Sequence, residues 1–139
     1  GEREELVLRF LAYSDRYLDF RHDVGRFLNK YIVEANDWSP EDIELKRRDF
    51  DQMLDFVANY FPYGFRRAPG SQEVPRVRFE AISVGVILAL RVDPALEASD
   101  FDWLDSEEFR NNVRTDASNS ARKLRARVEY VRDRLLELA

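Results

Sequence analysis

The chain has 139 residues, a length that suits one compact domain. Hydrophobic residues make up 45% of it and aromatic residues 13%, which excludes a disordered chain although 35% of the residues are charged. Cysteine is absent, so disulfides, thiolate metal sites and a cysteine nucleophile are excluded. The net charge of −5 argues against indiscriminate nucleic-acid binding by the whole surface. No apolar run approaches the roughly 20 residues of a membrane span, and we predict a cytoplasmic protein without membrane contact.

Helical periodicity begins near the N-terminus. Apolar residues recur every three or four positions and predict one helix over 2–20 and another over 24–35. Ser39 and Pro40 form a strong helix start, because serine caps free backbone N–H groups and proline fits the first helical position. The helix that they begin is expected to end before Pro62.

The rest of the chain is predicted to form a loop and three helices: a loop over 62–75, a helix over 77–92, a short helix over 106–113 and a last helix over 119–138. The helix over 77–92 has no polar face, which is the pattern of a central, buried helix. The last helix has a basic face, which we call its basic back, opposite an apolar seam. The seam residues are spaced four and three positions apart in turn: Leu124, Val128, Val131, Leu135 and Leu138. We therefore predict a single all-α domain over 1–139, with about six helices around a central buried one.

Residues 93–108 carry seven acidic side chains and no basic one. Clustered carboxylates suit Mg²⁺ or Ca²⁺, but no Asp-x-Asp-x-Asp-Gly loop is present. Three apolar residues interrupt the acids: Phe101, Trp103 and Leu104. We predict a solvated linker with apolar anchors and no metal. His22-Asp23 resembles the paired ligands of HD-type phosphohydrolases, but the chain has one histidine, and we predict a surface histidine at a helix end.

Four arginines lie near the start of the predicted buried helix: Arg66, Arg67, Arg76 and Arg78. Guanidinium groups bind phosphates, and they also pair with buried carboxylates such as Glu80. If Glu80 is buried, it must be paired or hydrogen-bonded. We favour an internal Arg–Glu pair, with Arg78 and Glu80 as structural polar residues. A phosphate site that includes Arg66 and Arg67 is the alternative.

The segment 114–124 is small and polar and opens onto the basic last helix. As a helix-turn-helix, it would direct side chains at phosphates or base edges from the helix N-terminus. Its candidate nucleic-acid contacts are Arg114, Ser118, Asn119, Ser120, Arg122 and Lys123. The alternative is helix capping, in which Asp116 or Ser118 accepts from free backbone N–H groups and the arginines form a solvated face. Residue chemistry favours capping.

Scattered segments carry a resemblance to a known family. They are ELVLRFLA over 5–12, FLNKY over 27–31, YGFRR over 63–67, RFEA over 78–81 and TDASNS over 115–120, followed by the arginine-rich last helix. Their order resembles the helical C-terminal part of the GmrSD-like family, whose first half was catalogued as domain of unknown function number 262. The resemblance spans nearly the whole chain.

The resemblance implies a multi-domain bacterial nuclease or nucleotidase in defence against phage and modified DNA. In that family the catalytic signature is an Asp-Gly-Gln-Gln-Arg motif in an N-terminal ParB-like domain, and some members add a C-terminal HNH nuclease domain. Neither motif occurs here, so no catalytic residue is carried over and the chain is expected to be a fragment. We predict a non-catalytic helical module without a cofactor, which adjoins a ParB-like domain and helps to engage DNA. The alternative is a structural or protein-interaction domain that docks its apolar seam on the parent protein or a second copy, without nucleic-acid contact.

Overall fold

The computed structural model describes residues 1–114 and 120–138. Within these residues the chain forms six α-helices and two short 3-10 helices and no strand, which confirms the predicted all-α class. In chain order the helices are α1 (Glu2–Arg16), η1 (Tyr17–Asp19), α2 (Val24–Ala35), α3 (Pro40–Tyr60), α4 (Arg76–Val92), η2 (Asp102–Asp105), α5 (Glu107–Asn112) and α6 (Ala121–Leu135).

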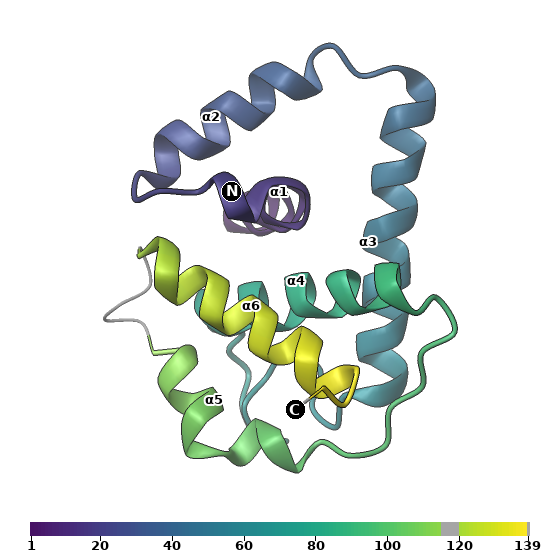
Figure 1. Ribbon diagram of the computed structural model, residues 1–139, viewed down its shortest axis with the longest axis vertical. Helices are drawn as coiled ribbons and strands as arrows, with labels where there is room; N and C mark the ends of the chain where they lie inside the picture. Colours follow the sequence, from purple (N-terminus) through teal and green to yellow (C-terminus); the bar gives the residue numbers. More distant parts are fainter. Residues whose placement is uncertain (115–119, 139) are drawn as a thin grey trace.

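Helix α4 lies at the centre of the fold and contacts α1, α3 and α6. In Figure 1, α6 runs alongside α4 in the lower half of the molecule, and α3 descends along the right-hand side. Helix α1 is seen nearly end-on above α4, and α2 forms the upper edge. All α4 residues from Val77 to Ile87 are buried, so the predicted central, buried helix is confirmed.

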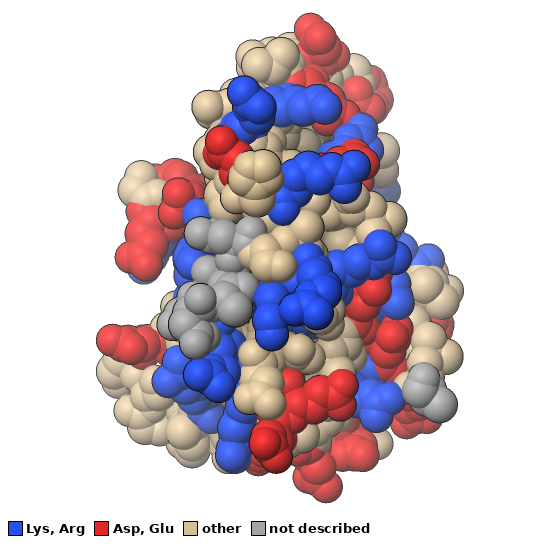
Figure 2. Space-filling view, turned by 60° about the vertical axis from the view of Figure 1, so that its left-hand side comes forward, with Lys and Arg blue, Asp and Glu red and all other residues tan. Residues whose placement is uncertain are grey.

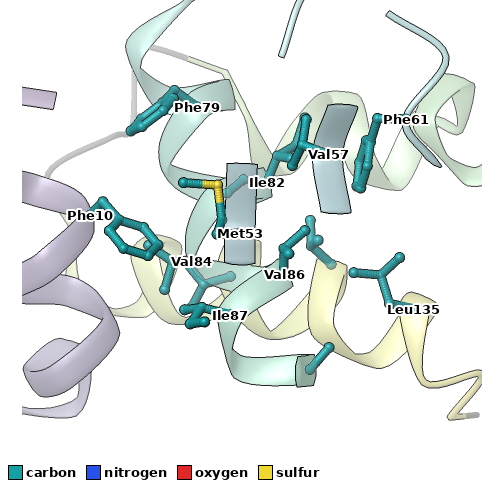
Figure 3. Packing of buried hydrophobic residues seen from close by; sticks show 14 of the residues in the cluster. Phe10, Met53, Val57, Phe61, Phe79, Ile82, Val84, Val86, Ile87 and Leu135 are labelled. Atoms are coloured by element: carbon teal, nitrogen blue, oxygen red, sulfur yellow. The ribbon is translucent and has the colours of Figure 1, made fainter. Parts of the chain in front are cut away.

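One hydrophobic core joins these helices. Figure 3 shows Phe10 of α1, Met53 of α3, Ile82 and Ile87 of α4 and Leu135 of α6 converging on the same interior. A smaller cluster under α2 is formed by Ala12, Leu28 and Tyr31. Helix α4 contributes to the core on every side because its sequence has no polar face.

The predicted start of α3 is confirmed in detail. The Ser39 hydroxyl accepts a hydrogen bond from the Asp42 backbone N–H at 3.1 Å, and the Ser39 N–H donates to the Asp42 carboxylate at 3.0 Å. This reciprocal pair is a capping box, and Pro40 occupies the first helical position. Helix α3 ends at Tyr60, before Pro62, as expected.

The first helix is shorter than predicted. Helix α1 ends at Arg16, and the chain tightens into η1 instead of continuing to Phe20. The tighter turn brings Phe20 back into the interior, where its ring meets Tyr13 edge-to-face with the centroids 5.8 Å apart. Burial of this aromatic ring explains why the helix is interrupted there.

The last helix is also shorter than predicted, because a backbone motif closes it after Leu135. Glu137 adopts a left-handed conformation with φ of 59°, and the Leu138 N–H donates to the Asp133 carbonyl at 2.8 Å. This is a Schellman-type ending. Leu138 therefore lies outside the helix, and with 50% of its surface exposed it is not part of the apolar seam, contrary to the prediction.

The other four seam residues of α6 are buried, and the helix packs closely on α4. Gly85 permits this close approach. A Cβ atom at Gly85 would lie 2.5 Å from the Val131 Cβ and 3.0 Å from the Val128 carbonyl oxygen. The seam is thus occupied within the domain, and any partner would have to use another surface.

Candidate functional site

An open cavity of about 610 Å³ lies beside the start of α4. Four parts of the chain line it: the loop after α3, the first turn of α4, the η2–α5 region and the residues after α5. The lining residues are Arg67, Arg78, Leu104, Asp105, Arg110, Val113 and Arg114. We call this cavity the arginine pocket. Its described lining holds four arginines and one aspartate and is positively charged, in a protein with a net charge of −5.

Arg78 is the most buried residue of the arginine pocket, with 7% of its surface exposed. Its guanidinium carbon lies 5.2 Å from the centre of the fully buried Phe109 ring. Its Nε has no hydrogen-bond partner, and none of the described residues forms an ion pair with it. Burial lowers the pKa of Arg78 and the neighbouring Arg67 lowers it further, whereas Asp105 opposes the shift. Arginine nevertheless stays charged in proteins, so Arg78 is a largely buried cation whose Nε has no acceptor among the described residues.

Burying the Arg78 guanidinium costs free energy, because a buried charge requires a partner. An anion bound in the cavity would supply that partner. The cation–π contact with Phe109 offsets only about 0.5–2 kcal/mol of the cost of burying the Arg78 charge. Arg67 and Arg110 are exposed, and within the described part of the chain the guanidinium of neither one forms a hydrogen bond or ion pair. Each guanidinium offers up to five N–H donors, so the pocket can bind an anion that has several oxygen acceptors.

Apolar anchors in the acidic linker hold one wall of the pocket. The Trp103 indole N–H donates to the Asp100 carbonyl at 3.1 Å, and the ring meets Phe61 and Phe109 edge-to-face with centroid distances of 6.1 and 5.5 Å. These contacts place Asp105, which ends η2, beside the pocket. The predicted apolar anchors are confirmed for Trp103 and its neighbour Leu104, which are both buried. The acidic run is not a linker throughout, because it forms η2 and the start of α5.

The loop after α3 holds the opposite wall. Arg66 donates to the Tyr63 carbonyl at 3.3 Å and to the Ser71 carbonyl at 3.5 Å, so its guanidinium braces the loop internally. Gly64 supports the turn with a φ of 61°, a conformation that favours glycine. Arg67 follows and lines the pocket. Of the two arginines predicted here as phosphate contacts, the structure places only Arg67 at the cavity.

An internal Arg–Glu pair exists as predicted, but Arg78 does not take part in it. Glu80 is 1% exposed, and its Oε1 lies 3.1 Å from Arg9 Nη1 and 3.5 Å from Arg76 Nη1. Its Oε2 lies 3.6 Å from Arg127 Nη1. Residues two apart on a helix point in different directions, which separates Arg78 from Glu80, whereas Arg76 is four residues away and on the same face. Glu80 is structural, and Arg78 is available to the pocket.

The predicted basic back of α6 is largely neutralised inside the domain. Arg127 is 1% exposed, and burial lowers its pKa while Glu80 opposes that shift. Arg125 pairs with Glu129 at 3.3 Å, four residues along the helix. Arg132 pairs with the neighbouring Asp133 at 2.8 Å. The helix therefore presents a mixed surface rather than a uniformly basic one along most of its length.

Ser120, rather than Asp116 or Ser118, caps α6. Its backbone is extended, and its hydroxyl accepts from the Lys123 N–H at 3.3 Å, so the helix begins at the next residue. Asp116, Ser118 and Asn119 lie outside the described residues. Ser120 and Arg122 are exposed, so the start of α6 faces solvent. Figure 2 shows basic side chains across the middle of one face of the molecule, with acidic side chains below and to the right of them.

The other predicted sites do not gather into a centre. His22 is exposed in the connection before α2, and the described residues hold no group of three or more His, Asp or Glu that could bind a metal. Sequence reasoning missed the pocket roles of Phe109 and Arg110. The four-residue spacing of Arg110 and Arg114 gave no signal for the pocket, because Arg110 lies in α5 and Arg114 follows the end of that helix.

Comparisons with known proteins add no relative, since no family model, no curated protein and no solved structure matches the chain. Across the described residues, no helix is long and apolar enough to cross a membrane. The chemistry of the arginine pocket is therefore the main guide to what the chain binds.

Proposed function

We propose that the chain is a non-catalytic helical module that binds nucleic acid through phosphate contacts. One observation carries this proposal: Arg78 is a buried cation with no acceptor among the described residues, at a cavity that three further arginines line. Phosphate oxygens are the acceptors that planar guanidinium groups match best, and nucleic acid presents them in a row.

The first turn of α6 supports the proposal as a second contact region. It carries Arg122 and Lys123 and no acidic residue. Positive side chains at a helix N-terminus oppose the helix dipole, so this turn gains from an approaching anion. Ser120 is exposed at the same point. The acidic surface elsewhere on the chain would repel the phosphate backbone and restrict binding to these basic regions.

We further propose that the module belongs to a cytoplasmic GmrSD-like defence protein and adjoins a ParB-like domain. Two of the segments that carry the resemblance, 63–67 and 78–81, each contribute one arginine to the pocket, Arg67 and Arg78. This coincidence supports the family proposal without testing it. Finding Asp-Gly-Gln-Gln-Arg upstream in the parent gene would support the assignment, and a parent gene without that motif would contradict it.

Fluorescence-anisotropy titration of duplex and single-stranded DNA at several salt concentrations tests the nucleic-acid proposal. Phosphate contacts require the affinity to fall as salt rises, because bound phosphates release counterions. The double variant Arg122→Glu and Lys123→Glu should weaken binding and reduce the salt slope by about 2, or roughly one per lost contact. A matched control is Arg47→Glu with Arg48→Glu, an equal charge change on two exposed residues of α3 away from the pocket. Absence of binding at low salt would overturn the proposal, and so would equal weakening by both double variants.

A second candidate function, a protein-interaction domain, is favoured by a different observation. Large apolar side chains are exposed on both sides of the α2–α3 turn: Ile32, Val33, Ile43 and Leu45. Exposed apolar groups near one another are typical of docking surfaces. Mass determination in solution tests self-association, and Val33→Glu with Leu45→Glu should abolish any dimer that uses this surface. A monomer that does not bind its parent domain would contradict this candidate.

A further inference from the structure

We infer that the arginine pocket binds a terminal phosphomonoester, the phosphate at the end of a nucleic-acid strand or on a free nucleotide, in preference to a phosphodiester within a strand. The inference rests on the proposed function in that it requires phosphate in this pocket. It names the part of the ligand that the pocket selects.

Arg78 can be reached only from inside the cavity. This residue extends from the first turn of α4 and is nearly fully buried, and its guanidinium is held against the buried Phe109 ring. A ligand oxygen must therefore enter the cavity to reach it. A phosphodiester inside a strand is flanked by a sugar on each side, whereas a terminal phosphate is attached through one ester bond and can enter end first.

The charge of the pocket suits a phosphomonoester better than a phosphodiester. A phosphomonoester carries between one and a half and two negative charges near pH 7 and offers three acceptor oxygens. An internal diester carries one charge and has two free oxygens. The described lining of the pocket comprises four arginines and one aspartate, and Arg67, Arg78 and Arg110 form no ion pair with any residue in 1–114 or 120–138. The dianion satisfies more of these donors and neutralises more of their mutual repulsion.

The size and lining of the pocket also suit the sugar that bears a terminal phosphate. About 610 Å³ is more than one phosphate fills, and it falls within the range of small-molecule sites in proteins. Leu104 and Val113 supply apolar lining beside the arginines. The pocket therefore has room for the sugar that bears the phosphate, in contact with these two side chains.

Direct comparison of strand ends tests the inference. Single strands of one sequence, labelled with the same dye, carry a 5′-phosphate, a 3′-phosphate or hydroxyls at both ends. We expect at least one phosphorylated strand to bind about tenfold more tightly than the hydroxyl strand at near-physiological salt. Adenosine monophosphate should compete for the pocket, and inorganic phosphate should compete more weakly.

Substitutions in the arginine pocket test whether it causes the difference in affinity between phosphorylated and hydroxyl strands. Arg78→Met should remove the preference for a phosphorylated end. Arg67→Gln and Arg110→Gln change exposed residues, so they keep the test valid if Arg78→Met does not fold. Arg122→Glu with Lys123→Glu should weaken binding of all strands and leave their ratio unchanged, because neither residue lines the pocket.

The outcomes separate this inference from the proposed function. Equal affinity for phosphorylated and hydroxyl strands would overturn the inference and leave nucleic-acid binding in place. If no strand binds but adenosine monophosphate binds in an Arg78-dependent way, the phosphomonoester site stands and the nucleic-acid function falls. If neither strands nor mononucleotide nor inorganic phosphate binds, both are wrong.

Discussion

Arg127 of α6 and Glu80 of α4 face one another inside the domain, with Arg127 Nη1 3.6 Å from Glu80 Oε2 and each side chain 1% exposed. Arg9 of α1 approaches the other carboxylate oxygen at 3.1 Å. A single buried carboxylate therefore links three helices that are far apart in the sequence. Its role is to neutralise arginines that the fold has removed from water.

Replacing Glu80 with Gln should destabilise the domain strongly. The change keeps the volume of the side chain but removes the buried negative charge that faces Arg9 and Arg127, which costs roughly 3–5 kcal/mol. Urea denaturation followed by circular dichroism measures the free energy of unfolding. The exposed Glu107→Gln is the control and should change it by less than about 0.5 kcal/mol. Similar values for the two variants would show that the buried pair contributes nothing.

Gly85→Ala should destabilise the domain even though alanine is the better helix former by about 1 kcal/mol. The new Cβ would lie 2.5 Å from Val131 Cβ and 3.0 Å from the Val128 backbone oxygen, so α4 and α6 would have to separate. Overpacking of this kind costs about 1–3 kcal/mol.

Gly25→Ala is the matched control for Gly85→Ala, because the same change in α2 meets only the Asp23 carboxylate at 3.6 Å. It should leave stability unchanged or raise it by up to about 1 kcal/mol. Thermal unfolding of the two variants measures the contrast. A gain of stability in Gly85→Ala would contradict the close α4–α6 packing.

The domain should lose stability as the pH rises from about 10 to 12. Burial, helped by Glu80, raises the pKa of Tyr13 to about 12, and burial with a hydrogen bond to Glu129 raises the pKa of Tyr17 to about 12. In the unfolded chain both titrate near 10. Between these values the folded state holds protons that the unfolded state has lost, so the free energy of unfolding falls as pH rises.

Tyrosinate absorbance during pH titration, together with denaturation at each pH, checks this dependence. Tyr13→Phe removes one of the hydroxyl groups with a raised pKa. The free energy of unfolding of this variant should therefore fall less steeply over the same pH interval. Tyrosines that all titrate near pH 10 in the folded protein would contradict the burial of these hydroxyl groups.

Asp105→Asn should increase the affinity of the arginine pocket for phosphate groups a few-fold. Among the described residues that line the cavity, Asp105 is the acidic one, and its charge acts on Arg78. Removing it reduces repulsion of an entering anion, an effect of about 0.2–1 kcal/mol for an exposed charge. Calorimetric titration with adenosine monophosphate measures the change.

Asp102→Asn is the control for Asp105→Asn, since Asp102 begins the same 3-10 helix, is exposed and does not line the cavity. It should alter affinity much less. Equal gains from the two variants would indicate a general effect of net charge rather than a local one at the pocket.

The sequence by itself determined the helices and most of their boundaries, because periodicity and capping act over a few residues. Helix α2 covers the predicted residues, and Ser39 begins α3 as expected. The central position of α4 also followed from sequence, since a helix with no polar face has to be buried. The misplaced helix ends lie at Phe20, which turns into the core, and at Leu138, which follows a left-handed Glu137.

Only the tertiary structure decided which charges are paired. Arg76, four residues before Glu80 on the same helix, could be assigned from spacing, but Arg9 and Arg127 reach Glu80 across 71 and 47 positions. Once these distant arginines and Arg76 surround Glu80, Arg78 is left on another side of α4, against Phe109. The pocket is assembled from four separate parts of the chain, and local periodicity carries no information about which of them meet.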